Sequence, residues 1–114
     1  MGLFGRFRGG RGRGPGPGPD LGYLQEWAGT RSGVEAFVEP QTRVTPLTVV
    51  LVAADGEWTR RPVGDAAGAR RVGERLAIPV YDVQKVGYPQ RMRDFDARRR
   101  SERRAAWETD SDPE

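Results

Sequence analysis

The strongest constraint on the fold is an apolar run near the middle of the chain, Leu47 to Ala54 (LTVVLVAA). The run is rich in β-branched residues and is bounded by Pro46 and Asp55-Gly56, so it predicts a central strand. Asp-Gly is the favoured two-residue hairpin turn, because type I′ geometry requires positive φ. It predicts a returning strand over Glu57 to Val63. Pro62 places that strand at an edge of the sheet, since proline cannot donate to a hydrogen-bond ladder.

The segments that flank this hairpin complete a small α+β domain. Val34 to Glu39 and Val80 to Val86 alternate apolar and polar residues and predict two further strands. Ala66 to Ala77 predicts a helix with Asp65 as its N-cap. The predicted order is therefore β-β-β-α-β, a small, mostly antiparallel sheet with one covering helix. The opposite face of such a sheet also needs cover.

Two features of the predicted helices bear on packing. Gly68 and Gly73 lie inside the helix over Ala66 to Ala77, where each costs about 1 kcal/mol relative to alanine. Their presence predicts a close approach of this helix to the sheet.

A second, short helix over Asp20 to Arg31 carries one apolar stripe and predicts a lid on the core. The stripe consists of Leu21, Leu24 and Trp27.

Charge and composition divide the chain into four segments. Residues 1–19 carry four arginines and no acid in a Gly/Pro-rich stretch that predicts a disordered tail. Residues 20–90 form the predicted core with its lid helix and are close to neutral. Residues 91–104 carry seven arginines against three acids and predict an arginine-rich helix, whereas residues 105–114 predict a disordered acidic tail. A near-neutral body between two basic arms favours contact with a polyanion or an acidic surface.

Several function classes are disfavoured by what the chain lacks. It contains no cysteine and no histidine, so it has no disulfide, no thiolate ligand and no imidazole base. It also has no Walker loop, nucleophile elbow or dinucleotide fingerprint. The sequence therefore favours a non-enzymatic protein without cofactor or metal. No apolar run approaches the ~20 residues of a membrane span, and a cytoplasmic location is expected.

Two arginine-rich segments supply the candidate nucleic-acid-binding residues. Residues 4–13 resemble RGG-type segments, in which flexible arginines meet phosphates and phenylalanines stack on bases. Residues 98–104 place positive charge around the predicted C-terminal helix. The alternatives are a solubilising tail and a solvated helix, in a chain whose preference for arginine over lysine indicates a GC-rich genome. The candidate phosphate contacts are Arg6, Arg8, Arg11, Arg13, Arg98, Arg99, Arg100, Arg103 and Arg104.

A second candidate surface combines aromatic and basic side chains. Trp58 beside Arg60 and Arg61 on an edge strand is suited to stacking a base or meeting a partner strand, although tryptophan in this position also fits the core. Tyr81 and Tyr88 near the end of the last predicted strand are suited to lining a pocket, or to packing under the helix. These residues fit an interaction surface for a copy of the chain or for a larger cytoplasmic complex.

Three stretches carry a resemblance to a known family: DGEWTRR at 55–61, IPVYDV at 78–83 and GYPQRMRDF at 87–95. In these the chain resembles a family of short uncharacterised actinobacterial proteins. The resemblance implies a bacterial cytoplasmic protein and brings no activity, ligand or residue role with it.

The leading hypothesis is a small cytoplasmic binding protein whose basic arms contact RNA without strong sequence preference. An accessory subunit that uses the exposed sheet face, including as a homodimer, is the alternative. A small-molecule enzyme or sensor is the third possibility.

Overall fold

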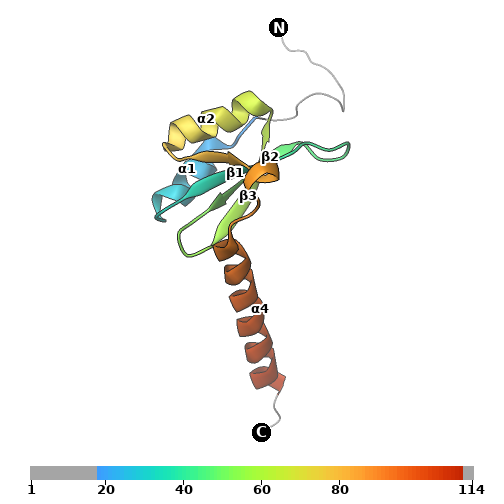
Figure 1. Cartoon of the computed structure of the whole chain (residues 1–114). Helices are drawn as coiled ribbons and strands as arrows, with labels where there is room; N and C mark the ends of the chain where they lie inside the picture. Colours follow the sequence, from blue (N-terminus) through green and yellow to red (C-terminus); the bar gives the residue numbers. More distant parts are fainter. Residues whose placement is uncertain (1–17, 112–114) are drawn as a thin grey trace.

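The computed structural model describes residues 18–111, which form one α+β domain with a long projecting C-terminal helix (Figure 1). The predicted tail over residues 1–19 and the end of the acidic segment lie mostly outside this described range. The elements in chain order are α1 (Leu21–Gly29), β1 (Glu35–Glu39), β2 (Leu47–Val52), β3 (Trp58–Gly64), α2 (Ala66–Leu76), β4 (Val80–Asp82), α3 (Val83–Val86) and α4 (Gln90–Ser111).

The sheet is mixed, with the strand order β3-β2-β1-β4. β2 pairs antiparallel with both β1 and β3, whereas β4 runs parallel to β1. The apolar run is thus central, as predicted, and the strand that contains Pro62 is at an edge. The helix α2 supplies the crossover that brings β4 beside β1 in parallel.

The hairpin between β2 and β3 differs in one detail from the prediction. The amide of Gly56 donates to the carbonyl of Ala53, so the turn centres on Ala54-Asp55 and not on Asp55-Gly56. Gly56 follows it with a φ of 95°, a conformation that favours glycine. This is a three-residue loop that ends in glycine, in place of the two-residue type I′ turn.

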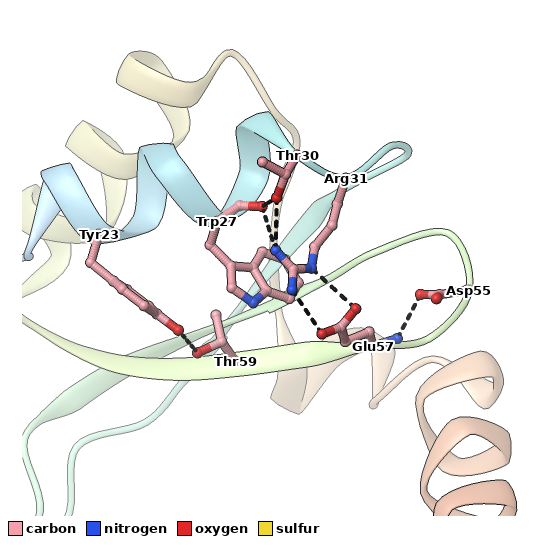
Figure 2. A network of polar contacts seen from close by, with 7 residues as sticks. All are labelled: Tyr23, Trp27, Thr30, Arg31, Asp55, Glu57 and Thr59. Carbon is pink, nitrogen blue, oxygen red and sulfur yellow. Dashed lines mark hydrogen bonds and ion pairs between the residues drawn. The ribbon is translucent and has the colours of Figure 1, made fainter.

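One face of the sheet is covered by α1 and α2. Leu24 and Trp27 of α1 are buried in the same cluster as Val49 and Leu51 of β2. The predicted lid helix is therefore confirmed as a packed element, and Asp20 caps it by accepting from the amide of Tyr23. Figure 2 shows two further contacts here: the Tyr23 hydroxyl of α1 bonds Thr59 of β3, and Arg31, just after α1, pairs with Glu57, just before β3.

The two glycines of α2 pack as the sequence predicted. A Cβ at Gly68 would collide with the carbonyl oxygen of Val63, and one at Gly73 would lie 2.5 Å from a methyl group of Val80. Asp65 caps the helix by accepting from the amide of Gly68 at 2.9 Å. The helix thus lies directly against the backbone of β3 at Gly68 and against the Val80 side chain of β4 at Gly73.

The opposite face of the sheet is covered by the C-terminal part of the chain. Phe37, Val50 and Val52 are buried there with Met92 of α4, and Tyr88 packs against them. Cover for this face comes from α3, the turn after it and the first turns of α4. The free sheet face that the alternative hypothesis required is therefore occupied.

The last predicted strand, Val80 to Val86, is shorter than expected. Only Val80–Asp82 pair with β1, and Val83–Val86 form a helical turn. The Asp82 side chain accepts from the amide of Gln84 and caps this turn, which ends at Gly87. Alternation alone predicted a strand, but the aspartate cap competes with ladder formation at an edge.

The C-terminal helix is longer than expected. α4 continues through residues 105–111, which the sequence analysis assigned to a disordered acidic tail. Ala105, Ala106 and Glu108 are good helix formers, and the Thr109 hydroxyl donates to the carbonyl of Ala105. Side chains from Ser101 to Thr109 are exposed. Over residues 18–111 no helix combines the length and the apolar character needed to cross a membrane.

Candidate nucleic-acid interface

The helix α4 is fixed to the domain at its first turns. The Arg91 guanidinium donates to the carbonyl of Ala53 at 2.9 Å and forms an ion pair with Glu35 at 2.7 Å. Gly56 permits this approach, because a Cβ there would collide with the carbonyl oxygen of Arg91. Met92, the next residue, is buried in the cluster that contains Phe37, Val50 and Val52. The anchor orients α4 so that the remaining turns project beyond the hairpin (Figure 1).

A groove of about 430 Å³ lies between the start of β3 and the exposed part of α4. The indole N–H of Trp58 donates to Asp96 at 2.9 Å. This hydrogen bond fixes β3 and α4, which form the two walls of the groove, relative to each other. Glu57 at the mouth is held by two hydrogen bonds from Arg31, at 3.1 and 2.8 Å (Figure 2). The groove is lined by Glu57, Trp58, Phe95, Asp96, Arg99, Arg100 and Arg103.

The arginines of α4 gather on one side of the helix. At about 100° per residue, five of them fall within an arc of about 140°. Asp94, Glu102 and Glu108 lie on the opposite half, together with Arg98, whereas Asp96 lies within the arc, between Arg103 and Arg100. Arg98 lies away from these five, so positive charge occurs around the helix as the sequence analysis expected, but most of it gathers on one side. We call this side the arginine face; it consists of Arg93, Arg99, Arg100, Arg103 and Arg104.

The arginines of this helix differ in what they already contact. Arg98 donates to the carbonyl of Asp55 at 3.1 Å. The guanidiniums of Arg98 and Arg99 both lie 5.7 Å from the ring centre of Phe95. Arg100, Arg103 and Arg104 are exposed and make no hydrogen bond or ion pair with the residues that the structure describes. Those three are available to an anionic ligand.

Four of the predicted phosphate contacts belong to the N-terminal tail. Arg6, Arg8, Arg11 and Arg13 lie outside the described residues; of the helix members of that predicted set, Arg99, Arg100, Arg103 and Arg104 share the arginine face and Arg98 does not.

The second predicted surface is divided between the two faces of the sheet. Arg61 lies on the α1 side, with its guanidinium 4.0 Å from the ring centre of Tyr23. Trp58 is half-buried and packs against the cluster that contains Phe37 and Met92, which agrees with the core alternative. Tyr81 stacks on Phe37 with ring centres 5.4 Å apart and remains partly exposed. The aromatic and basic residues of this set do not form one continuous surface.

The carboxylate of Glu39, which the sequence analysis did not single out, binds several of the polar side chains on the sheet face that α4 covers. Glu39 is 13% exposed and receives two hydrogen bonds from Arg60, at 2.7 and 2.8 Å, and one from Thr48 at 2.6 Å. Tyr88 also donates to it. Burial alone would raise the pKa of Glu39, but these hydrogen bonds outweigh it and lower the pKa from 4.5 to about 2. Arg60 and Tyr88, predicted as interaction residues, are therefore engaged within the domain.

Comparison with models of protein families, with curated proteins and with solved structures finds no match to this chain. The resemblance to short actinobacterial proteins therefore stays a prediction. Within residues 18–109, no group of three or more acidic side chains is placed to hold a metal ion.

Proposed function

We propose that this is a non-enzymatic, cytoplasmic RNA-binding protein whose contact surface is the arginine face of α4 and the adjacent groove at Trp58. The observation that supports the proposal most directly is the arginine face itself. From Arg93 to Arg104 it extends for about 16 Å along a helix that projects from the domain. Guanidiniums in this arrangement can contact successive phosphates of one strand, and such contacts depend little on sequence.

The groove adds a reason to favour an unpaired strand. Arg99, Arg100 and Arg103 supply positive charge along it, while Glu57 and Asp96, which already accept from Arg31 and Trp58, offer the remaining lone pairs of their carboxylates beside two aromatic side chains. Carboxylates accept hydrogen bonds from exocyclic amino groups of bases, and aromatic rings contact base faces. A base must leave a duplex to reach such a groove. We therefore expect single-stranded RNA to bind more tightly than duplex RNA.

Binding should depend steeply on salt, and the dependence should fall when the arginine face is neutralised. In the full-length Arg99/Arg100/Arg103→Gln variant, the slope of log K against log salt should fall in magnitude by about 2, because each neutralised phosphate of a single strand contributes about 0.7. The affinity near 0.15 M salt should fall on the order of 10- to 100-fold. Fluorescence anisotropy with a labelled single-stranded RNA across a salt series measures both quantities.

The matched control removes three arginines from another helix. Arg70, Arg71 and Arg75 are exposed on α2, so their triple replacement by glutamine changes the net charge equally. If both triple variants lose the same affinity, the effect is one of net charge and the proposed surface is wrong. An Arg6/Arg8/Arg11/Arg13→Gln variant measures the contribution of the N-terminal arginines separately. Absence of binding at physiological salt would reject the function as a whole.

A further inference from the structure

A second groove, of about 630 Å³, lies on the α2 side of the sheet, away from the arginine face. Its wall on α2 is built from small residues, Ala66, Ala69 and Gly73. Val38, Ile78 and Val80 supply larger apolar side chains on the other side. Arg70, Glu74 and Asp82 also line the groove, as does Tyr81, whose ring stacks on Phe37. The lining is therefore mostly apolar, with two carboxylates and one guanidinium.

We propose that residues 3–8 of the same chain, Leu3-Phe4-Gly5-Arg6-Phe7-Arg8, occupy this groove. The proposal rests on other residues than the RNA-binding surface does, and it goes beyond the proposed function. Its arguments are the place where the described chain begins, the length that precedes it, and the match in chemistry.

The described chain begins against the helix that forms the groove. Gly18 lies beside the guanidinium of Arg71, and the ring of Pro19 lies beside Gly68. α2 has 11 residues and is about 16 Å long. The chain from Phe7 to Gly18 can span up to about 36 Å, so residues 3–8 can pass around this helix and reach the groove. A segment tethered this closely has an effective concentration in the millimolar range, so weak contacts suffice to hold it.

The chemistry of the segment matches the chemistry of the groove. Besides Met1, the large apolar residues of the first 19 are Leu3, Phe4 and Phe7, and an aromatic ring packs well over a wall of alanine and glycine. Arg6 and Arg8 alternate with them and can reach the carboxylates of the groove. The Glu74 side chain is exposed and makes no hydrogen bond or ion pair with the described residues, so it is available for such a pair.

Paramagnetic relaxation tests the proposal in the full chain. The protein has no cysteine, so a Gly2→Cys variant carries one spin label beside the segment. Amide signals of Ala69, Gly73 and Val80 should lose most of their intensity in the oxidised sample and recover it after reduction. A Phe4/Phe7→Ser variant with the same label should retain these signals.

A pair of matched variants locates the contact. Ala66 lines the groove and Ala67 does not, although both lie in the first turn of α2. Ala66→Phe fills the groove and should abolish the broadening, whereas Ala67→Phe should leave it unchanged; the amide spectrum itself reports whether each variant folds. Equal broadening in both variants, or none at the groove in the parent, overturns the proposal. Broadening of an unlabelled chain mixed with labelled chain would assign the groove to a second copy and also overturn it. No RNA is present, so the outcome is independent of the proposed function.

Discussion

Replacement of Gly68 by alanine is expected to lower the free energy of unfolding by about 2 kcal/mol. Helix propensity alone predicts the opposite sign, because alanine is favoured over glycine by about 1 kcal/mol inside a helix. The added Cβ, however, would collide with the carbonyl oxygen of Val63 and lie 3.0 Å from its carbonyl carbon. Both atoms belong to the backbone of β3, so α2 itself must shift away from the sheet. Urea denaturation followed by circular dichroism measures the change.

Gly22 of α1 provides the control for this prediction. A Cβ there would meet only the Asp20 carboxylate, at the ordinary contact distance of 3.8 Å. Gly22→Ala should therefore stabilise the protein by about 0.5–1 kcal/mol. If Gly68→Ala also stabilises, the close approach of α2 to β3 is not a constraint on this fold and the packing argument fails.

Local signals in the sequence were sufficient for much of the fold. Asp65 acts as a helix cap as predicted, and Asp20 caps α1 in the same way, since capping depends on residues within one turn. The β-branched run over Leu47 to Ala54 correctly predicted the central strand, and Pro62 the edge. Gly68 and Gly73 predicted close packing because two glycines in one helix are costly without such a reason.

What the sequence could not give depends on contacts between distant segments. Alternation over residues 80–86 does not reveal that Asp82 caps a helical turn, or that this stretch has a neighbour on one side only. The groove beside Trp58 depends on where α4 leaves the domain, which the contacts of Arg91 decide. The arc of the arginine face, in contrast, was available from helical periodicity once the helix was placed over residues 90–104.

The Glu39 cluster is the clearest case of a feature beyond local reasoning. Its members come from β1, β2, β3 and the turn before α4, and no spacing in the sequence relates them. The register that pairs Glu39 with Thr48 is the one signal that a strand prediction could have used. The cluster links the sheet to Tyr88, and so to the segment from which α4 begins. The cluster therefore helps to fix where α4 begins, and with it the position of the proposed RNA-binding surface.

Glu39→Gln is expected to lower the free energy of unfolding at pH 7 by about 2 kcal/mol. The replacement removes the negative charge that faces Arg60 and leaves Thr48 and Tyr88 with a weaker acceptor. Loss of one partner from a fully buried ion pair costs about 3–5 kcal/mol, but the Arg60 side chain is 43% exposed and water compensates part of the loss. Chemical denaturation at pH 7 measures the difference. Glu26→Gln, which changes an exposed carboxylate of α1, should stay within about 0.5 kcal/mol of the parent protein.

The same substitution should alter the dependence of stability on acid. The pKa of Glu39 falls from 4.5 to about 2 on folding, so the folded state holds this carboxyl less protonated than the unfolded state does. Its contribution is therefore fully present above pH 4.5 and is lost as the pH falls through about 2. Glutamine cannot titrate, so the deficit of the variant should be constant from pH 7 to pH 5 and should shrink towards pH 2. A deficit that stays unchanged at pH 2 would mean that the interaction is one of shape and hydrogen bonding alone, and that the charge of Glu39 does not hold Arg60 and Tyr88 in place.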